Sequence, residues 1–458
     1  MTEFEAAVQL CQIIKTTGRT AVFAGGCVRD MLLGRPFSDI DIATDCPDDV
    51  LNRVLLFHLI VPKPVGKAFG VILAKVWEKE YAEKGHTFEI ARFRKDINCD
   101  GRHPESVQFC SMEEDSQRRD FTINAVFYDP IAEKYYDFVN GIDDIKNKRL
   151  VFVGNPEDRI REDYLRVLRY IRFYARGFKT TKKERQFVDS FAEEMFKAVS
   201  PERIRMEFMD KILPSLKDSR VFKEFPKVFN LLFDGVPDKL LLVNQNPKWH
   251  PEGDVWTHTL KVVDFMLDNK LRTPLLLLSA ILHDFGKLTD TFFDNDTKNW
   301  RSPGHENTGT SMARDWMIKY KFSNAEIAYV EWLVLNHMKL HYSGLKKSTL
   351  KRLIFDGDIT GLMVLTLCDC MGASGNITEF LRYEEKIKEI LSEGTNTRPP
   401  PILTGFDLIC AGMKPGRHFG IILSKAYDRQ LEDGAVTKEE LLKEALKNET
   451  GSRTTIPS

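Results

Sequence analysis

Two aspartates and a glycine turn give the first indication of chemistry. Asp39 and Asp41 lie two residues apart in a segment that we predict to be a strand, where alternate side chains share one face. Two carboxylates so placed repel each other, and they are suitable ligands for a pair of divalent metal ions. Shortly before them, Gly25 and Gly26 follow one predicted strand and open a helix, so that backbone N–H groups and Arg29 can face a phosphate. In this order, the two motifs together indicate nucleotidyl transfer.

A third acidic residue could complete this metal site. Glu89 lies on another predicted strand and is the candidate, although a plain strand carboxylate is an equally good interpretation of it. Each motif taken alone also has an ordinary structural interpretation, namely an exposed D-x-D that caps a helix and a common glycine turn. The combination is what favours catalysis.

A basic segment further along the chain could select a nucleotide. Residues from Arg159 to Tyr174 have helical period, with arginines on one side and apolar residues on the other. On such a helix Asp163 and Arg166 would present a carboxylate acceptor beside a guanidinium donor. Cytosine and adenine each show an amino donor beside a ring-nitrogen acceptor, whereas uracil and guanine would leave buried groups unpaired. The pair predicts selection of C and A, but alone it would be an ordinary surface ion pair.

Histidines are concentrated in the second half of the chain. Six of the ten fall between residues 250 and 341, and four of these six occur with two aspartates in the order H…HD…H…H…D. Imidazoles and carboxylates are ligands of divalent transition metals, and helices can bring them together on one or two ions. We assign His250 and His341 to core or surface roles. The predicted metal ligands are His258, His283, Asp284, His305, His337 and Asp369.

Two kinds of architecture must position these residues. The first ~140 residues alternate short strand-like and helical segments, which predicts an α/β head with a mixed sheet flanked by helices. From about Pro156 the pattern is helical nearly to the end, so the rest of the chain is mostly α. Proline and asparagine clusters indicate the breaks. We expect a head over residues 1–145, a helical neck over 146–243, a metal-binding helical domain over 244–398 and a helical tail over 399–458.

Charge and composition narrow the class of protein. The 458 residues carry 66 Lys and Arg against 67 Asp and Glu, which excludes a uniformly basic nucleic-acid coat protein. The segment Lys146–Arg185 nevertheless has 13 basic and 5 acidic residues, a net +8, and predicts salt-sensitive RNA binding. The acidic start is unlike a signal peptide, and no apolar stretch nears the ~18 residues that span a bilayer. We expect a cytoplasmic protein with no membrane partner, and its oligomeric state stays open.

The motifs resemble those of class II tRNA nucleotidyltransferases, the family of CCA-adding enzymes and bacterial poly(A) polymerases. The resemblance runs from about Val22 to Leu213 and more loosely to the end. It covers the family's G-G-x-V-R-D with D-x-D in 25–41, R-R-D-F-T-I-N-A in 118–125, E-D-x-x-R in 162–166, and E-R-I with K-I-L in 202–213, the last with one extra residue in its spacing.

The resemblance implies a role for each matching residue. Asp39 and Asp41 would hold catalytic Mg²⁺, and Asp163 and Arg166 would be the protein template for CTP and ATP. The RNA substrate would be tRNA, bound through its acceptor end and backbone. The other implied nucleotide contacts are Gly25, Gly26 and Arg29 to the triphosphate, Arg119 and Asp120 to the nucleotide with Asp120 checking the ribose hydroxyl, and Arg169 and Arg172 to phosphates.

Within the family, CCA addition is favoured over its alternatives. The segment Arg94–Pro104 resembles the flexible loop that reorients the template between C and A, which disfavours an enzyme adding only CC. Poly(A) polymerases share all of these motifs but tend to carry two basic residues after a glycine and before Phe. Here Ala68, between Lys67 and Phe69, breaks that pattern.

The histidine motif resembles an HD phosphohydrolase domain, with Gly286 and Lys287 following the HD pair. Some members of the family carry such a domain and use it on 2′-nucleotides, 2′,3′-cyclic phosphates or phosphate monoesters. The resemblance therefore implies a second activity with a divalent transition metal or Mg²⁺. The alternative from a different class is an RNA-binding HD phosphohydrolase with an inactive head, which the intact D-x-D motif disfavours.

Overall fold

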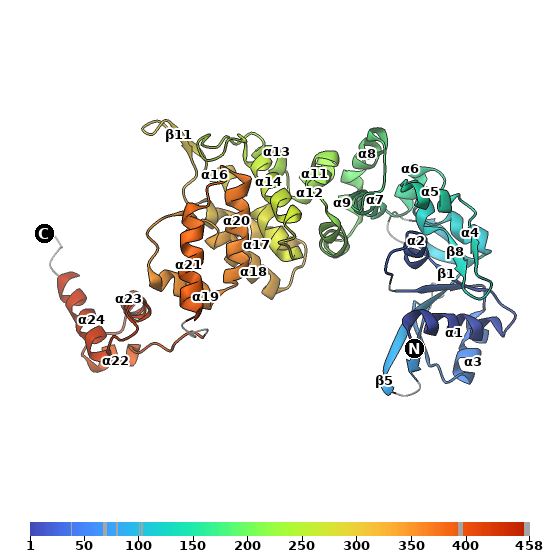
Figure 1. Cartoon of the computed structure of the whole chain (residues 1–458), viewed down its shortest axis with the longest axis horizontal. Coiled ribbons are helices and arrows are strands. Elements are labelled where there is room, and N and C mark those ends of the chain that lie inside the picture. The colour runs from blue at the N-terminus through green and yellow to red at the C-terminus, as the bar shows by residue number, and fades with distance from the viewer. Residues whose placement is uncertain are drawn as a thin grey trace. The chain divides into compact units, whose positions relative to one another are not determined.

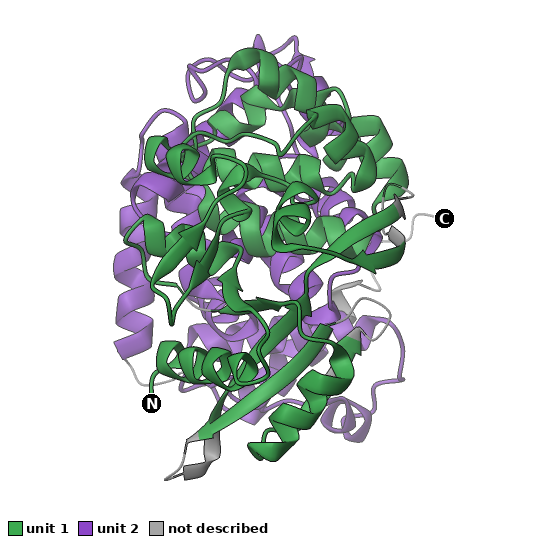
Figure 2. Ribbon diagram, turned by 90° about the vertical axis from the view of Figure 1, so that its right-hand side faces the viewer, with its two compact units in different colours: residues 1–234 green, residues 235–458 purple. Residues whose placement is uncertain are grey.

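The computed structural model divides into two compact units, residues 1–234 and residues 235–458, which Figure 2 shows in green and purple. The first unit contains a mixed sheet with flanking helices and further helices after it, and the second is mostly helical (Figure 1), which confirms the predicted fold class. The division into head, neck, metal-binding domain and tail stays a prediction. The residues described are 1–37, 39–66, 71–78, 81–99, 101, 104–392 and 397–452.

A mixed sheet organises the head. Its strand order is β3-β4-β5-β2-β1-β8-β9; β2 and β5 run parallel, and the other neighbouring pairs are antiparallel. All four side chains of β1 are buried, because Phe23 meets Phe4 of α1 at 5.7 Å on one face, while Val22 packs with Phe127 on the other. The head elements are α1 (Glu3–Lys15), β1 (Ala21–Ala24), α2 (Gly26–Leu32), β2 (Asp41–Thr44), α3 (Asp48–Phe57), β3 (Pro62–Gly66), β4 (Val71–Glu78), β5 (Tyr81–Arg92), α4 (Met112–Gln117), the 3₁₀ turn η2 (Thr122–Asn124), β8 (Phe127–Asp129), β9 (Lys134–Tyr136) and α5 (Gly141–Asn147).

A separate hairpin occupies the segment that resembles the flexible loop. β6 (Arg94–Cys99) and β7 (Pro104–Phe109) pair antiparallel, so this segment contains a two-stranded ladder. Several residues on which the sequence comparison depends lie outside the described residues. They are Asp100, Arg102 and His103 of the loop-like segment, and Lys67, Ala68 and Phe69 of the comparison with poly(A) polymerases.

Helices with an aromatic core follow the head. Tyr170 of α7 stacks on Phe152 at 5.5 Å, and Phe121 meets Phe173 edge-on at 5.4 Å. The apolar side of α7 is thus buried, as its sequence period predicts. The elements are α6 (Pro156–Glu162), α7 (Arg166–Ala175), α8 (Lys182–Asp189), α9 (Ala192–Ala198), α10 (Pro201–Glu207), the π-helical η3 (Phe208–Ile212), η4 (Leu213–Ser215), α11 (Arg220–Glu224) and α12 (Pro226–Leu232).

The second unit is built on a bundle in which α14, α15, α18 and α20 pack together. α15 is apolar on all sides and buried, and Thr273 caps it by accepting from the N–H of Leu276. Among the described residues, no helix combines the length and apolar character needed to cross a membrane. The elements are α13 (Val236–Leu240), α14 (Val255–Asp268), α15 (Pro274–Leu282), α16 (Lys287–Asp290), β10 (Phe292–Asp294), β11 (Asn299–Arg301), α17 (His305–Lys319), α18 (Asn324–Asn336), η5 (Lys339–His341), α19 (Lys347–Asp356), α20 (Ile359–Gly372) and α21 (Thr378–Ser392).

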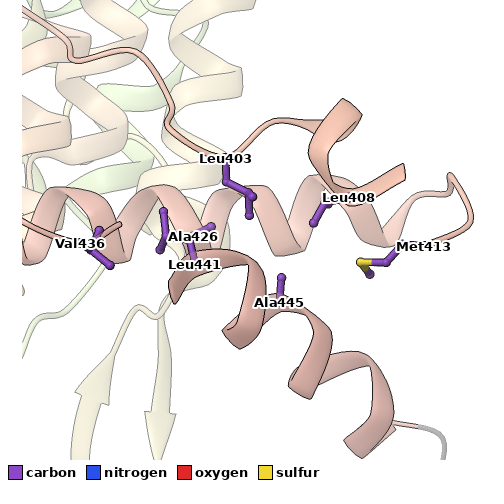
Figure 3. Packing of buried hydrophobic residues seen from close by; sticks show 7 residues of the cluster. All are labelled: Leu403, Leu408, Met413, Ala426, Val436, Leu441 and Ala445. Atoms are coloured by element: carbon purple, nitrogen blue, oxygen red, sulfur yellow. The ribbon is translucent and has the colours of Figure 1, made fainter. Parts of the chain in front are cut away.

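Three helices at the end of the described chain share a small core of their own. α22 (Gly405–Cys410), α23 (His418–Glu432) and α24 (Lys438–Ser452) bury short apolar side chains between them. Figure 3 shows this cluster, which consists of Leu403, Leu408, Met413, Ala426, Val436, Leu441 and Ala445.

Candidate functional site

The turn between β1 and α2 brings the backbone close to two predicted site residues. Gly25 has a φ of +75°, in the left-handed region that favours glycine. A Cβ atom at Gly25 would lie 3.6 Å from Nη1 of Arg119 and 3.6 Å from Oδ2 of Asp41. The glycine turn, an arginine and a carboxylate therefore meet in one place.

The predicted placement of Asp39 and Asp41 on one face of a strand is wrong. β2 begins at Asp41, and Asp39 precedes it with a φ of +56°, its backbone N–H donating to Oε1 of Glu3 at 3.2 Å. The alternation rule fails because the chain passes through a left-handed residue before the ladder begins. Glu89, in contrast, lies as predicted on a neighbouring strand, β5, which pairs in parallel with β2.

The pKa of the Asp41 carboxyl reflects the negative charge that surrounds it. Desolvation, together with the carboxylates of Glu89 and Asp39 and against the opposing effect of Arg119, raises the pKa of Asp41 to about 6. Carboxylates that lack enough positive charge around them form an environment that a divalent cation stabilises. The donor chemistry of Asp39, Asp41 and Glu89 therefore fits Mg²⁺.

Arg29 is buried beside the glycine turn and is held by protein partners. Its Nε and Nη2 donate to the carboxylate of Asp30 at 3.0 and 2.7 Å, and its Nη1 donates to Oδ1 of Asn124 at 2.8 Å. The guanidinium also lies 5.1 Å from the ring centre of Phe173. Arg29 is thus a fixed positive charge in the wall of the site.

A buried aspartate that the sequence analysis missed positions Arg119. Oδ2 of Asp115 accepts from Nε and Nη2 of Arg119 at 3.1 and 2.9 Å, and its Oδ1 accepts from the backbone N–H of Arg94 at 3.1 Å. Burial alone would raise the pKa of Asp115, but Arg119 and Arg118 lower it overall. The sequence contains a signal for this ion pair, because Asp115 of α4 stands four residues before Arg119.

Asp120 belongs to a second ion pair. Its Oδ2 accepts from Nε of Arg169 at 2.7 Å, and its Oδ1 accepts from Nδ2 of Asn124 at 3.0 Å. Burial would raise the pKa of Asp120, but Arg169 and Asn124 bring it down to about 2. Asp120 is therefore ionised and rigidly held at neutral pH.

Arg172 follows the same pattern one turn further along α7. Its Nη1 lies 3.1 Å from Oε1 of Glu207. Burial lowers the pKa of Arg172 to about 10, against the opposing effect of Glu207. The arginine side of α7 is thus partly neutralised by acidic partners.

The continuous helix predicted over Arg159–Tyr174 is wrong. α6 ends at Glu162, Asp163 is extended (φ −151°, ψ 103°), and α7 begins at Arg166. Asp163 and Arg166 are therefore not neighbours on a helix surface. Instead, Asp163 forms a parallel β-bridge with Gly101, a tertiary contact that interrupts the helical pattern.

Separate partners hold the two predicted template residues. Nη2 of Arg203 donates to both carboxylate oxygens of Asp163 at 3.3 and 3.2 Å. Arg166 donates to Oε2 of Glu162 at 2.7 Å and to two backbone carbonyl oxygens. These bonds use three of the five N–H groups of a guanidinium, so Arg166 keeps donors for a ligand.

One cavity of about 400 Å³ brings the predicted nucleotide-binding residues together. Its lining has seven arginines and three aspartates, which suits a ligand with several negative charges. The lining residues are Gly25, Gly26, Arg29, Asp41, Arg118, Arg119, Asp120, Asn124, Asp163, Leu165, Arg166, Arg169, Arg172 and Arg203.

In the second unit, Asp284 lies between two pairs of histidines. Its Oδ2 is 3.3 Å from Nε2 of His283 and 3.7 Å from Nε2 of His258. Its Oδ1 is 3.3 Å from Nε2 of His305 and 3.8 Å from Nε2 of His337. One carboxylate thus offers a different oxygen to each pair, and each pair with Asp284 has the spacing of a metal-ligand set.

The protonation of three of these imidazoles follows from their partners. Nδ1 of His283, His305 and His337 lies 2.8, 2.7 and 2.6 Å from the backbone carbonyl oxygen three residues earlier. A carbonyl only accepts, so each Nδ1 carries the proton and each Nε2 presents a lone pair. These lone pairs face the oxygens of Asp284, and acceptors that converge in this way fit a cation between them.

Asp369 completes the predicted set. Its Oδ1 lies 2.8 Å from Nε2 of His258, and its Oδ2 lies 3.0 Å from Nε2 of His341. His341 therefore lies at the edge of the cluster, although the sequence analysis assigned it to a core or surface role. Lys287 adds an ion pair, with its Nζ 2.7 Å from Oδ2 of Asp284.

Glu252 is a further residue that the sequence analysis missed. Its side chain is 0% exposed, and its Oε1 lies 3.0 Å from Nδ1 of His250 and 2.9 Å from Nδ1 of His258. His250, also left out of the predicted set, thus connects to the cluster through Glu252. An isolated glutamate in a turn gives no periodic signal that could have revealed this contact.

A glycine contact fixes the HD turn against α17. A Cβ atom at Gly286 would overlap the carbonyl oxygen of His305 and lie 2.6 Å from the backbone nitrogen of Gly309. The backbone after Asp284 therefore packs directly on the first turns of α17. This contact sets where His305 stands relative to Asp284.

A cavity of about 510 Å³ opens beside the histidine cluster. His305, Asp369 and Lys287 form part of its wall. Its remaining wall includes aromatic side chains, among them Trp249 and Trp300. The cluster is therefore accessible to a ligand larger than a single phosphate group.

Comparisons with known protein families match both units. The sequence model described as the Poly A polymerase head domain matches residues 21–151, and that of the HD domain matches residues 255–361. A CCA-adding enzyme of Bacillus cereus (strain AH187) is 34% identical over 258 residues, which cover 54% of this chain and 61% of that protein. A CCA-adding enzyme of Bacillus anthracis is 35% identical over 240 residues, which cover 52% and 56%. The matched part thus spans about three fifths of the length of these relatives.

Solved structures match over almost the whole chain. The Bacillus stearothermophilus CCA-adding enzyme in complex with CTP has a TM-score of 0.65 and 21% identity, and the match covers 99% of this chain and 100% of that one. The Thermotoga maritima CCA-adding enzyme complexed with tRNA has a TM-score of 0.55 and 19% identity, covering 97% and 95%. These structures share the fold. Residues 21–151 thus match the Poly A polymerase head domain and residues 255–361 the HD domain, which confirms the resemblance of the chain to the class II tRNA nucleotidyltransferases and bacterial poly(A) polymerases.

Proposed function

We propose that this chain adds C, C and A to the 3′ end of tRNA, using CTP, ATP and Mg²⁺ and no nucleic-acid template. The observation that carries the proposal is the cavity of about 400 Å³ in which the glycine turn, Asp41, Arg119 and the pair Asp163 and Arg166 meet. Relatives with the name CCA-adding enzyme support it. In this proposal the head is residues 1–145, the neck 146–243, the HD domain 244–398 and the tail 399–458.

Each predicted site residue has a defined task in this reaction. Asp39, Asp41 and Glu89 would hold Mg²⁺, which supplies Lewis acidity at the attacking 3′-hydroxyl and the leaving pyrophosphate. Gly25, Gly26, Arg29, Arg169 and Arg172 would bind the triphosphate, and Arg119 and Asp120 the rest of the nucleotide.

Base selection would rest on two side chains from different segments. Asp163 accepts from the exocyclic amino group of C or A, while Arg166 donates to the ring nitrogen beside it. Arg203 supports the role of Asp163, because it holds both carboxylate oxygens and so limits their orientation. The acceptor end of tRNA would approach over the basic segment Lys146–Arg185.

End addition to tRNA that lacks its last three nucleotides tests the proposal. Wild-type protein with CTP and ATP should yield products three nucleotides longer, and Asp41→Asn should yield none. Glu113→Gln, an exposed carboxylate on α4, serves as the matched control and should retain the wild-type rate. Long A tails would instead indicate a poly(A) polymerase, and no extension at all an inactive head.

We also infer that the HD domain hydrolyses phosphoesters with a divalent transition metal or Mg²⁺. The cluster around Asp284 beside the cavity of about 510 Å³ supports this second activity. The expected substrates are 2′-nucleotides, 2′,3′-cyclic phosphates or phosphate monoesters. Asp284→Asn should abolish phosphate release while end addition continues, and Asp39→Ala should do the reverse. If either substitution abolished both activities, the two sites would not be independent.

A further inference from the structure

The four histidines of the cluster are not held in the same way. His283, His305 and His337 donate their Nδ1–H to neutral backbone carbonyls. Nδ1 of His258 lies instead 2.9 Å from the carboxylate of Glu252. A carboxylate polarises the N–H group more strongly than a carbonyl does, which makes the opposite ring nitrogen a stronger donor to a metal. His258 is therefore the most electron-rich imidazole of the four.

Glu252 is placed to act on His258. Its side chain is 0% exposed, and Oε1 lies between the Nδ1 atoms of His250 and His258. The nearest lysine amine, that of Lys261, stands 4.0 Å from Oε2 on a side chain that is 49% exposed. Burial of a carboxylate costs free energy unless its charge is paired or hydrogen-bonded. Here the two imidazoles are the close polar partners of the Glu252 carboxylate.

The two sides of the cluster also differ in negative charge. The pair His258 and His283 faces Oδ2 of Asp284 and Oδ1 of Asp369, with Glu252 behind it. The pair His305 and His337 faces Oδ1 of Asp284. The nearest carboxylate behind that second pair, Glu306, is 29% exposed and 3.7 Å from Nδ1 of His305, beyond hydrogen-bond distance.

We propose that Glu252 acts as a positioning residue for His258, and that it thereby makes one of the two cation sites of the cluster tighter than the other. The tight site lies at His258, His283, Asp284 and Asp369. The weak site lies at Asp284, His305 and His337. This inference rests on the proposed metal-dependent function of the HD domain, and it adds an order of filling and the residue that determines it.

Titration of the metal-free full chain with Co²⁺ tests the proposal. The titration is followed by visible absorption and by bound metal after gel filtration, in an Asp41→Ala background that removes the cation site of the head. We expect two steps. Glu252→Gln should weaken the first step by about 10–100-fold and leave the second unchanged, because an amide polarises the imidazole less than a carboxylate does. His337→Ala should remove the second step and keep the first.

Glu379→Gln provides the matched control, since Glu379 lines the same cavity and should leave both steps unchanged. Melting temperatures close to that of the parent identify variants that fold. If Glu252→Gln shifts neither step, or only the second, or if the parent shows a single class of equal sites, the inference is overturned while the metal site stands. If the parent binds no Co²⁺, the proposed HD metal site itself fails.

Discussion

The apparent affinity for the Mg²⁺ that supports nucleotide addition should fall as the pH falls through 6. The pKa of Asp41 is raised to about 6, so roughly nine tenths of this carboxyl is ionised at pH 7 and roughly one tenth at pH 5. Protons and metal compete for the same oxygen, and the apparent affinity for Mg²⁺ should therefore be about tenfold lower at pH 5 than at pH 7. An aspartate with an ordinary pKa would remain almost fully ionised over this range.

Glu89→Gln tests the cause of that shift. The carboxylate of Glu89 raises the pKa of Asp41, so its removal should lower this pKa and move the loss of Mg²⁺ affinity to lower pH. The ratio of affinities at pH 7 and pH 5 should then fall well below ten. The absolute affinity should also fall, because Glu89 is a proposed ligand, and each profile is therefore normalised to its own value at pH 8.

The assay is the initial rate of CTP incorporation into tRNA that lacks its end, measured against Mg²⁺ concentration between pH 5 and 8. Glu113→Gln, on the exposed side of α4, should keep the wild-type ratio and controls for titration of the nucleotide. An equal Mg²⁺ requirement at pH 5 and 7 in the wild type would refute the reasoning. An unchanged ratio in Glu89→Gln would show that Glu89 does not act on Asp41.

Three further substitutions and one salt titration test other parts of the site. Asp163→Asn should raise misincorporation of UTP relative to CTP by about tenfold, because an amide can donate where a carboxylate only accepts; unchanged selectivity would exclude Asp163 from base reading. Gly25→Ala should reduce the free energy of unfolding by about 1 kcal/mol, since alanine is strained at a φ of +75°, and urea denaturation that detects no loss would contradict this. Asp120 has its pKa lowered from 3.8 to about 2, so its ionised form stabilises the fold above pH ~4 and this effect is lost as pH falls through ~2. Asp120→Asn should therefore lower the free energy of unfolding by about 2 kcal/mol at pH 7 and by less near pH 2 in urea titrations. Binding of tRNA should weaken steeply between 50 and 200 mM salt, as expected for several phosphate contacts at Lys146–Arg185, and a flat salt profile would argue against that surface.

Local patterns predicted the elements better than they predicted the contacts between them. The glycine turn was predictable, because Gly25 and Gly26 follow a buried strand and open a helix. The break at Asp163 was not, because the bridge from Gly101 is a tertiary contact that overrides helical period. Similarly, Arg203 holds Asp163 from 40 residues away, and no local rule indicates such a partner.

In the histidine cluster, too, the sequence predicted the ligands but not all of the contacts between segments. The order of its ligands along the chain predicted that helices bring them together, because each stands near the end of, or within, a buried helix. Glu252 and His341 could not be assigned from the sequence, since their roles depend on where the ends of neighbouring segments meet.

The close packing of Gly286 on α17 has a consequence for which ions the HD domain can accommodate. A backbone contact has no rotamers, so the backbones that carry Asp284 and His305 are held at a fixed separation. A change in backbone separation to suit a larger or smaller ion must therefore come from the opposite wall, where α14 carries His258 and α20 carries Asp369. Discrimination between small and large divalent ions should therefore be governed by the packing of α14 against α20 rather than by the HD turn itself.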